Sequence, residues 1–377
     1  MKRRFAFLGA ILFMAGSVVS AQEVDSSAPQ QMSSWEDANQ TDVVDYVPAI
    51  SLDARFGYNR NVSDKTGGFG GDGLYLNIDG KISKNFTYSL CQRLFSSHGE
   101  DSSVFDATDW LNLTYEVGSF SFTAGKDVVA VGSYEYDAYD IDSYFDMNSI
   151  FYNSFSCYQW GVKAMWSPSD SSSLAFQVTT SPFSYAPLED NIYAYNLAWY
   201  GEWESYTSIW SANLFEYEPG KFVKTLALGN MFYAGNLSLG LDVIMRGEKV
   251  KNLGRDITIN FMPSYEFADC IRLFGKAGFE RVGEQPYDFW GEYLTVDEMV
   301  AANEENTAIL PAFAIPNQNY WFYGAGIEYF PLKENKDIRL HAMWASNNYT
   351  KRHVVNVGLT WKFDIVSAIK HIARKAK

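Results

Sequence analysis

The chain has 377 residues and a formal net charge of −15, which argues against a nucleic-acid partner because such partners require a basic surface. Aromatic residues make up 17% of the chain, yet Ser, Asn, Asp and Gly separate them instead of aliphatic runs. This composition is unusual for a water-soluble domain. It is typical of a β-barrel whose outer face meets lipid and whose inner face meets water.

The N-terminal residues 1–21 have the layout of a secretory signal. Lys2 to Arg4 are basic and precede a short apolar run, which ends in the small residues Val19 to Ala21. This run is too short to cross a bilayer as a helix, and no later stretch reaches the roughly 18 apolar residues that a helical span needs. We therefore expect export through a cleaved signal peptide to the bacterial outer membrane, with residues 22–48 as a periplasmic N-terminal arm.

Alternation of apolar and polar residues is the main signal in the rest of the chain. It runs from Ile50 to Asn59 and recurs from Asn236 to Arg246 and from Val355 to Ile365. A tilted transmembrane strand needs roughly 9 to 11 residues, which matches these segments. The pattern predicts sixteen strands and leaves fourteen or eighteen open. The predicted strands are 50–60, 72–82, 84–95, 108–117, 119–127, 155–167, 172–180, 191–201, 204–216, 221–234, 236–246, 254–267, 270–282, 319–330, 336–346 and 353–365.

The connections between these strands alternate between short turns and longer loops. The first of the longer connections, 61–71, contains Gly67 to Gly71 and is predicted to be a flexible loop. Bacterial barrels sort their connections in this way, with short turns in the periplasm and longer loops outside. The sequence therefore predicts an all-β fold, a membrane-spanning antiparallel β-barrel over residues 49–366. A basic C-terminal tail is expected at 367–377.

Carrying the alternation through the strands places charged side chains on the polar, lumen-facing side. The basic members are Arg55, Arg93, Lys163, Arg246, Arg272, Lys276, Arg339 and Lys362. The acidic members are Asp53, Asp79, Glu116, Asp242, Glu280, Glu328 and Asp364. Because the two signs nearly balance, the wall alone predicts no ion preference. Pairing of these charges with one another is the alternative to a role in selectivity.

The third long loop, 128–154, is acidic and aromatic. Its acidic residues are Glu135, Asp137, Asp140, Asp142 and Asp146, with no basic residue among them. Its aromatic residues include Tyr134, Tyr136, Tyr139, Tyr144 and Phe145. Because this aromatic density does not suit a solvated loop, we expect the loop to fold inward and form a constriction, its carboxylates facing wall Arg and Lys across the solute path. Packing on the rim or on a neighbouring subunit is the alternative.

Around this loop the chain reads TAGKD at 123–127, VGSYEYD at 131–137 and SFSCYQWGVK at 154–163. These stretches resemble the porin O and P family, the phosphate-selective porins and their relatives, in which a strand ending in Gly-Lys leads into a Gly-rich third loop. The resemblance implies a sixteen-stranded, commonly trimeric barrel with the third loop folded inward, and it brings Lys126 into the candidate constriction. Phosphate-selective members depend on basic residues there, whereas this loop is acidic, so phosphate specificity is not implied.

The sequence thus predicts an outer-membrane porin, in contact with outer-membrane lipid and assembled as a homotrimer, for passive diffusion of small hydrophilic solutes or ions. A catalytic function is not expected, because His341 has no Ser or Asp partner by alternation. No cofactor or metal ion is expected, since Cys91, Cys157 and Cys270 show no metal-binding spacing. A surface binding protein or adhesin that uses loop 283–318 is the alternative.

Overall fold

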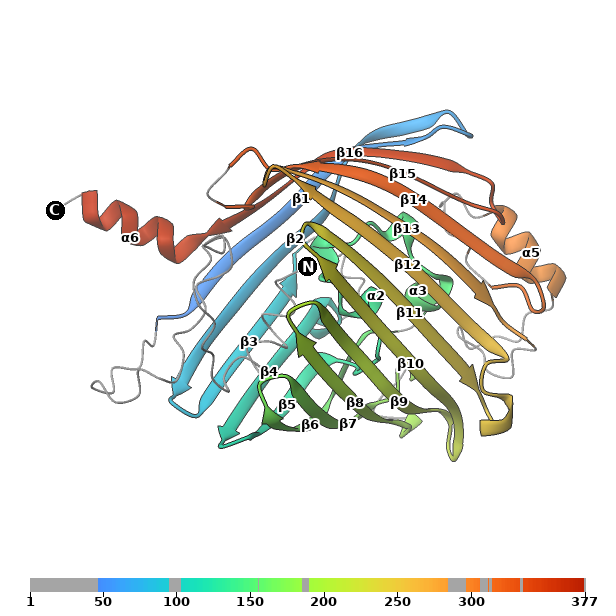
Figure 1. The fold of residues 1–377 in the computed structure, drawn as a ribbon, viewed down its shortest axis with the longest axis horizontal. Coiled ribbons are helices and arrows are strands. Elements are labelled where there is room, and N and C mark those ends of the chain that lie inside the picture. The colour runs from blue at the N-terminus through green and yellow to red at the C-terminus, as the bar shows by residue number, and fades with distance from the viewer. Residues whose placement is uncertain are drawn as a thin grey trace.

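In the computed structural model, the described residues are 47–94, 103–154, 156–184, 190–283, 296–305, 311, 314–332 and 335–375. Sixteen strands among them form one closed antiparallel barrel, in which β1 pairs with β16 (Figure 1). The predicted signal peptide 1–21, nearly all of the predicted arm 22–48 and much of loop 283–318 lie outside the described residues.

The strands follow one another around the barrel in sequence order. The first eight are β1 (Ala49–Asn61), β2 (Thr66–Ser83), β3 (Phe86–Arg93), β4 (Thr108–Val117), β5 (Phe120–Val128), β6 (Tyr158–Ser169), β7 (Ser172–Thr180) and β8 (Tyr193–Trp203). The second eight are β9 (Tyr206–Glu218), β10 (Lys221–Ala234), β11 (Leu237–Gly247), β12 (Asp256–Phe267), β13 (Ile271–Arg281), β14 (Asn319–Tyr329), β15 (Ile338–Asn347) and β16 (His353–Asp364).

Each strand sends alternate side chains to the two faces of the barrel. In β5, Phe120 and Phe122 are both 47% exposed on the outer face, whereas Ser121 and Thr123 between them are buried inside. This is the apolar-out, polar-in alternation that a lipid-facing barrel requires. The predicted strand number, the antiparallel order and the barrel are confirmed.

The two ends of the barrel differ in the length of their connections. At one end, which we call the turn end, two-residue turns contain Gly118 and Gly235, whose φ angles of 55° and 58° favour glycine. The long connections, including α5 (Val296–Glu305), lie at the opposite loop end (Figure 1). Short turns at one end and longer loops at the other are therefore both present, as predicted.

The glycine-rich segment 67–71 is strand and not the predicted flexible loop. β2 begins at Thr66, and Gly67 pairs with Arg60 while Gly71 pairs with Phe56. Backbone hydrogen bonding needs no side chain, so a glycine run continues the ladder where its partner strand is long enough. The prediction of a loop over 61–71 is wrong, and the connection shrinks to residues 62–65.

The C-terminal tail is helical from its first turn. Helix α6 (Ile365–Lys375) follows β16 directly at the turn end, and Asp364 accepts hydrogen bonds from the backbone nitrogen and the hydroxyl of Ser367 at 2.9 and 2.8 Å. No helix among the described residues is both long and apolar enough to cross a membrane.

Candidate pore constriction

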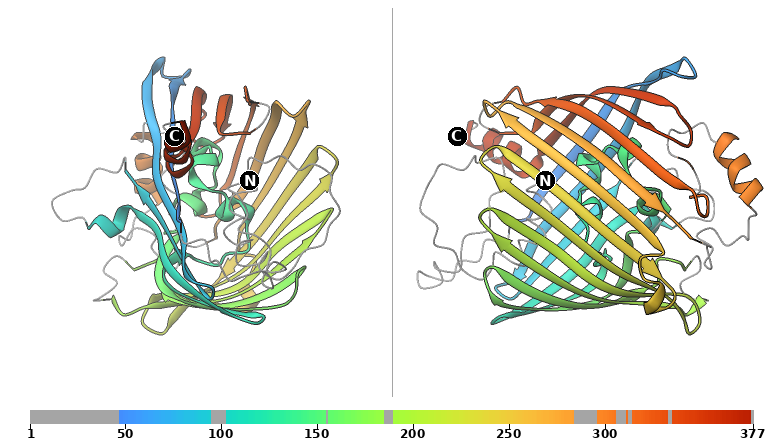
Figure 2. Two further views of the ribbon diagram at one scale, coloured as in Figure 1. Left: turned by 90° about the vertical axis from the view of Figure 1, so that its left-hand side faces the viewer. Right: turned by 45° about the vertical axis from the view of Figure 1, so that its right-hand side comes forward.

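The long connection between β5 and β6 enters the barrel. We call this segment, residues 129–157, the inserted loop. It carries two short α-helices, α2 (Tyr134–Asp137) and α3 (Ile150–Ser154), and the 3₁₀ turns η4 (Asp140–Asp142) and η5 (Phe145–Met147). Figure 2 shows these elements inside the ring of strands. The predicted inward folding of the third loop is confirmed.

The first part of the inserted loop lies directly on the backbone of the wall at Gly132. Its nitrogen donates to Ser211 Oγ at 2.8 Å, and a Cβ atom at this position would come within 2.5 Å of the Ala227 carbonyl oxygen. The same Cβ atom would lie 2.6 Å from the Ile209 carbonyl oxygen. Only glycine allows so close an approach, so Gly132 fixes the loop against β9 and β10.

A carboxylate of the wall caps the first helix of the inserted loop. Asp242, on β11, is fully buried. Its Oδ2 accepts from Ser133 Oγ at 2.7 Å and from the backbone nitrogen of Glu135 at 3.0 Å, and its Oδ1 accepts from the backbone nitrogen of Tyr134 at 3.0 Å. The free N–H groups at the start of α2 thus meet an anion supplied by a distant strand.

The second helix is capped in the same way by Glu280 of β13. Its Oε2 accepts from the backbone nitrogens of Ile150 at 3.0 Å and Phe151 at 3.3 Å. Arg246, on β11, lies 3.4 Å from the other oxygen of Glu280, and its guanidinium sits 4.1 Å from the centre of the Phe151 ring. Both helices are therefore held by buried carboxylates of the inner wall.

Glu135 of α2 binds both the rest of the inserted loop and the wall. Its Oε1 accepts from Lys276 Nζ at 2.6 Å and from the Ser149 backbone nitrogen at 2.8 Å. Its Oε2 accepts from Ser149 Oγ at 2.6 Å and from Asn260 Nδ2 at 2.9 Å. The side chain is fully buried. Through these bonds Glu135 joins α2 to the residue that precedes α3 and to two strands of the wall.

Two arginines on neighbouring parts of the wall bind the middle of the inserted loop. Arg55 donates to the carbonyl oxygens of Ile141 at 3.0 Å and Ser143 at 2.7 Å. Arg339 donates to the Ile141 carbonyl at 2.9 Å and to Asp142 Oδ1 at 2.6 Å. These contacts secure η4 between β1 and β15.

Glu328 of β14 links the wall arginines to Tyr144. It pairs with Arg272 and lies 3.4 Å from Arg339. Tyr144 donates to Glu328 Oε1 at 3.0 Å and stacks on Phe274 with ring centres 5.0 Å apart. Burial raises the pKa of Tyr144 well above its ordinary value, so its hydroxyl remains a donor.

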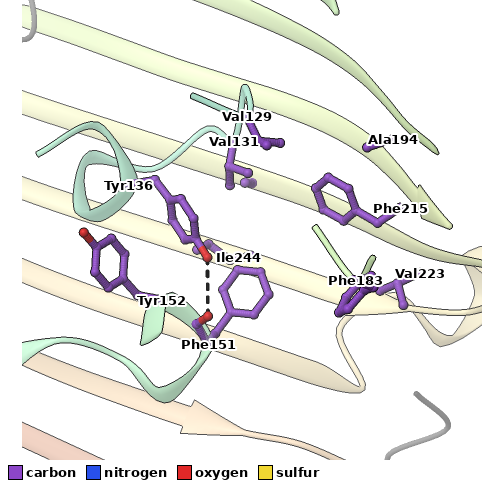
Figure 3. Packing of buried hydrophobic residues seen from close by; sticks show 11 residues of the cluster. Val129, Val131, Tyr136, Phe151, Tyr152, Phe183, Ala194, Phe215, Val223 and Ile244 are labelled. Atoms are coloured by element: carbon purple, nitrogen blue, oxygen red, sulfur yellow. Dashed lines mark hydrogen bonds between the residues drawn. The ribbon is translucent and has the colours of Figure 1, made fainter. Parts of the chain in front are cut away.

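Apolar packing fills the space between the inserted loop and β8 to β11. Tyr136 and Phe151 come from the two helices, and Phe215 and Ile244 from the wall; all four are buried (Figure 3). The Tyr136 hydroxyl also donates to the Phe151 carbonyl at 3.3 Å. Tyr136 and Phe151 are therefore core residues, which is why this part of the loop does not lie in solvent.

The structure brings together only part of the predicted constriction. Glu135 and Asp142 touch wall cations directly and do not face them across a gap. Asp137 is half-buried, and the side chain of Asp140 lies outside the described residues. Lys126 donates to the Phe105 carbonyl at 2.7 Å, so it holds the preceding loop.

Seven of the eight predicted basic wall residues divide into two groups. Arg55, Arg246, Arg272, Lys276 and Arg339 contact the inserted loop or the carboxylates that bind it. Arg93 and Lys163 instead pair with strand-borne acids, at 2.9 Å with Asp109 and at 2.5 Å with Asp127. Lys362 is half-buried on β16, where its backbone pairs with Asp53.

A residue of the site that sequence alternation missed is Asp72. The register between β1 and β2 shifts between Arg55 and Phe56, and Asp72 is the extra residue of this β-bulge. The bulge interrupts the alternation, so the sequence pattern does not show which face Asp72 occupies. The carboxylate lies 2.8 Å from Arg55 Nε. The glycine at 132 and the capping role of Asp242 and Glu280 also carried no local signal in the sequence.

A cavity of about 400 Å³ opens between the inserted loop and the wall, toward the loop end. Its lining includes Arg55, Asp72, Tyr144, Asp146 and Asn356. Burial, followed by the charge of Asp72, raises the pKa of Asp146 to about 6, and Arg55 opposes this shift. The cavity therefore presents one arginine and two carboxylates beside a tyrosine ring.

Comparison with known proteins supports the fold. No protein-family model matches the sequence, and no curated protein matches it. In vitro folded OmpT, an outer membrane protein of Vibrio cholerae, is 12% identical with a TM-score of 0.55, covering 84% of this chain and 97% of that chain. A triple mutant of the Rhodopseudomonas blastica porin is also 12% identical, with a TM-score of 0.53 and coverage of 84% and 100%. The chain thus has the closed sixteen-stranded barrel fold of outer-membrane porins.

Proposed function

We propose that this protein is a porin through which small hydrophilic solutes and ions diffuse passively across the outer membrane. The observation that carries the proposal is a loop fixed inside a closed barrel by charged side chains of the wall. Barrels of about sixteen strands enclose an aqueous lumen, and a loop held within it narrows the path without sealing the ends.

The proposed path runs past β13 to β16, β1 and β2. On this side of the inserted loop, charged side chains keep contact with solvent: Asp72 is 38% exposed, and Asp142 and Arg272 are each 17% exposed. Lys276, paired with Glu135, lies on the same wall. Opposite charges placed side by side along a path favour polar solutes and weaken any single ion preference.

We further propose membership of the porin O and P family and a homotrimeric assembly, supported by the strand number and the inserted loop. The proposed organisation comprises a cleaved signal peptide at 1–21, a periplasmic arm at 22–48, the barrel at 49–366 and a basic tail at 367–377. We propose no enzymatic activity: His341 bonds to Asn356 and packs edge-on against Tyr144 at 5.1 Å, which suits a structural role.

Conductance in a planar lipid bilayer tests the proposed function. We expect stepwise single-channel openings and a modest preference for K⁺ over Cl⁻ in asymmetric KCl, since Asp72 and Asp146 outnumber Arg55 in the cavity. The double variant Asp72→Asn/Asp146→Asn should move the reversal potential toward anions. A folded barrel that gives no conductance steps would favour the surface binding protein instead.

The ion preference should depend on pH. Because the pKa of Asp146 is raised to about 6, its carboxyl is charged at pH 7.5 and mostly neutral at pH 5. We therefore expect the preference for K⁺ to weaken as the pH falls through 6, and the variant Asp146→Asn to remove this step. The pKa of Asp146 is higher in the folded protein than in the unfolded chain, so protonation of this carboxyl stabilises the fold at low pH. This contribution to the free energy of unfolding is lost as the pH rises through 6.

Reversal potentials measured at half-unit pH intervals, on the wild type and on Asp146→Asn, resolve this step. The nearby charged groups are Asp72 and Arg55, and neither is altered in the comparison. A step of equal size in both proteins would assign it to another group.

A further inference from the structure

A basic patch lies on the outside of the barrel at the loop end of β10 to β13. We call it the basic rim and define it by Lys224, Lys249, Lys251 and Arg281. Lys224 lies between Val223 and Thr225, whose side chains are buried in the lumen, so it faces outward. By the same alternation Arg281 faces outward, since Glu280 and Val282 on either side are both buried.

The connection between β11 and β12 folds down over this outer face. Arg246 points into the lumen, so Gly247 faces outward, and a Cβ atom on Gly247 would lie 2.8 Å from the Asn252 carbonyl oxygen. The 3₁₀ turn η6 (Val250–Asn252) therefore packs on the outside of the wall. Lys249 and Lys251 are exposed there, and Val250 between them is 74% exposed.

The positive charge of the basic rim is poorly compensated. In the part of the chain that the structure describes, Lys249, Lys251 and Arg281 form no ion pair. Lys224 donates to the backbone carbonyl of Glu248, whose carboxylate accepts from the Tyr217 hydroxyl. A surface of this kind stands out in a chain whose net charge is −15.

Aromatic side chains border the basic rim next to Arg281 on the outer face. Phe279, two residues before Arg281 on the same outer face, packs against Trp321 with ring centres 4.6 Å apart, and Trp321 is 51% exposed. Exposed aromatic rings at a strand end mark the interface between hydrocarbon and headgroups. Cations just beyond such rings are therefore expected at the level of the lipid phosphates.

We propose that the basic rim binds a phosphate-bearing lipid headgroup of the outer leaflet. Lysine and arginine side chains supply the charge-assisted hydrogen bonds that phosphate oxygens accept. Val250 lies between two of the cations, so an apolar contact with the lipid accompanies the ionic ones. The site is on the outside of the barrel and is separate from the proposed solute path.

Binding of phosphatidic acid to the purified protein in neutral detergent micelles tests this proposal. The triple variant Lys249→Gln/Lys251→Gln/Arg281→Gln removes three positive charges that attract an anionic lipid surface, so it should bind at least about tenfold more weakly than the wild type. Wild-type binding should also weaken as salt is added. Phosphatidylcholine, which carries no net charge, should bind the wild type and the variant equally weakly.

A matched control removes three exposed lysines elsewhere, in Lys65→Gln/Lys84→Gln/Lys370→Gln, and should bind phosphatidic acid within twofold of the wild type. Unchanged migration of unboiled samples on a gel establishes that both variants keep the closed barrel. Equal binding by the wild type and the rim variant overturns the proposal. Displacement of the lipid by equimolar inorganic phosphate overturns it as well, because the site would then take the free anion.

Discussion

Replacing Glu135 by alanine is expected to release the inserted loop from the wall. The buried carboxylate accepts four hydrogen bonds, one of them from the half-buried amine of Lys276 at 2.6 Å. Its removal leaves that amine without its anionic partner, which costs about 3–5 kcal/mol when the site is buried. We expect single-channel conductance to rise and to fluctuate, and the midpoint of urea unfolding to fall.

The double variant Glu135→Ala/Lys276→Met distinguishes the cost of an unpaired Lys276 charge from the cost of a displaced inserted loop. Because no unpaired charge remains, the double variant should be more stable than Glu135→Ala alone, and the two effects should not add. Measuring unfolding in urea for the wild type, both single variants and the double variant gives the coupling energy. Conductance and stability of Glu135→Ala equal to those of the wild type would show that the loop is held without this residue.

Gly132→Ala is expected to lift the start of the inserted loop away from β9 and β10. The new methyl group would meet the Ala227 and Ile209 carbonyl oxygens at 2.5 and 2.6 Å, and neither backbone atom can move without distorting the wall. Overpacking of this kind costs about 1–3 kcal/mol. The hydrogen bond from Gly132 to Ser211 should be lost, and the conductance should change.

Gly68→Ala provides the control, because no atom lies within 4 Å of its added Cβ. This substitution therefore measures the effect of a glycine-to-alanine change without a steric clash. Urea unfolding of this variant should stay within about 0.5 kcal/mol of the wild type. If both alanine variants behave alike in unfolding and in conductance, the close approach at Gly132 does not position the loop.

The barrel could be predicted from sequence because a sheet between lipid and water imposes a local rule. Each strand needs apolar residues at every second position, as from Ile50 to Asn59, and the rule requires no knowledge of other strands. The inward folding of the third loop followed from its tyrosines, which need a surface to cover them. These features depend on residues that are near one another in the chain.

The arrangement inside the lumen could not be predicted in the same way. Asp242 and Glu280 were placed correctly on the inner face, yet nothing in their own segments shows that they cap helices more than a hundred residues earlier in the chain. Asp72 was missed because one bulge reverses the alternation that would have placed it. The loop acids were expected across the path from the arginines, but burial favours direct contact, since separated charges without water are costly.

The pairing of β1 with β16 has a consequence for how the chain reaches its native state. This seam joins Ser51 to Asp364 and Asn61 to Val354, so the two strands come from opposite ends of the polypeptide. Until the last strand is in place, the growing sheet keeps two open edges that can recruit other chains. Contacts so distant in sequence form slowly. Assembly should therefore be cooperative, and chains that end before residue 353 should aggregate instead of forming smaller barrels.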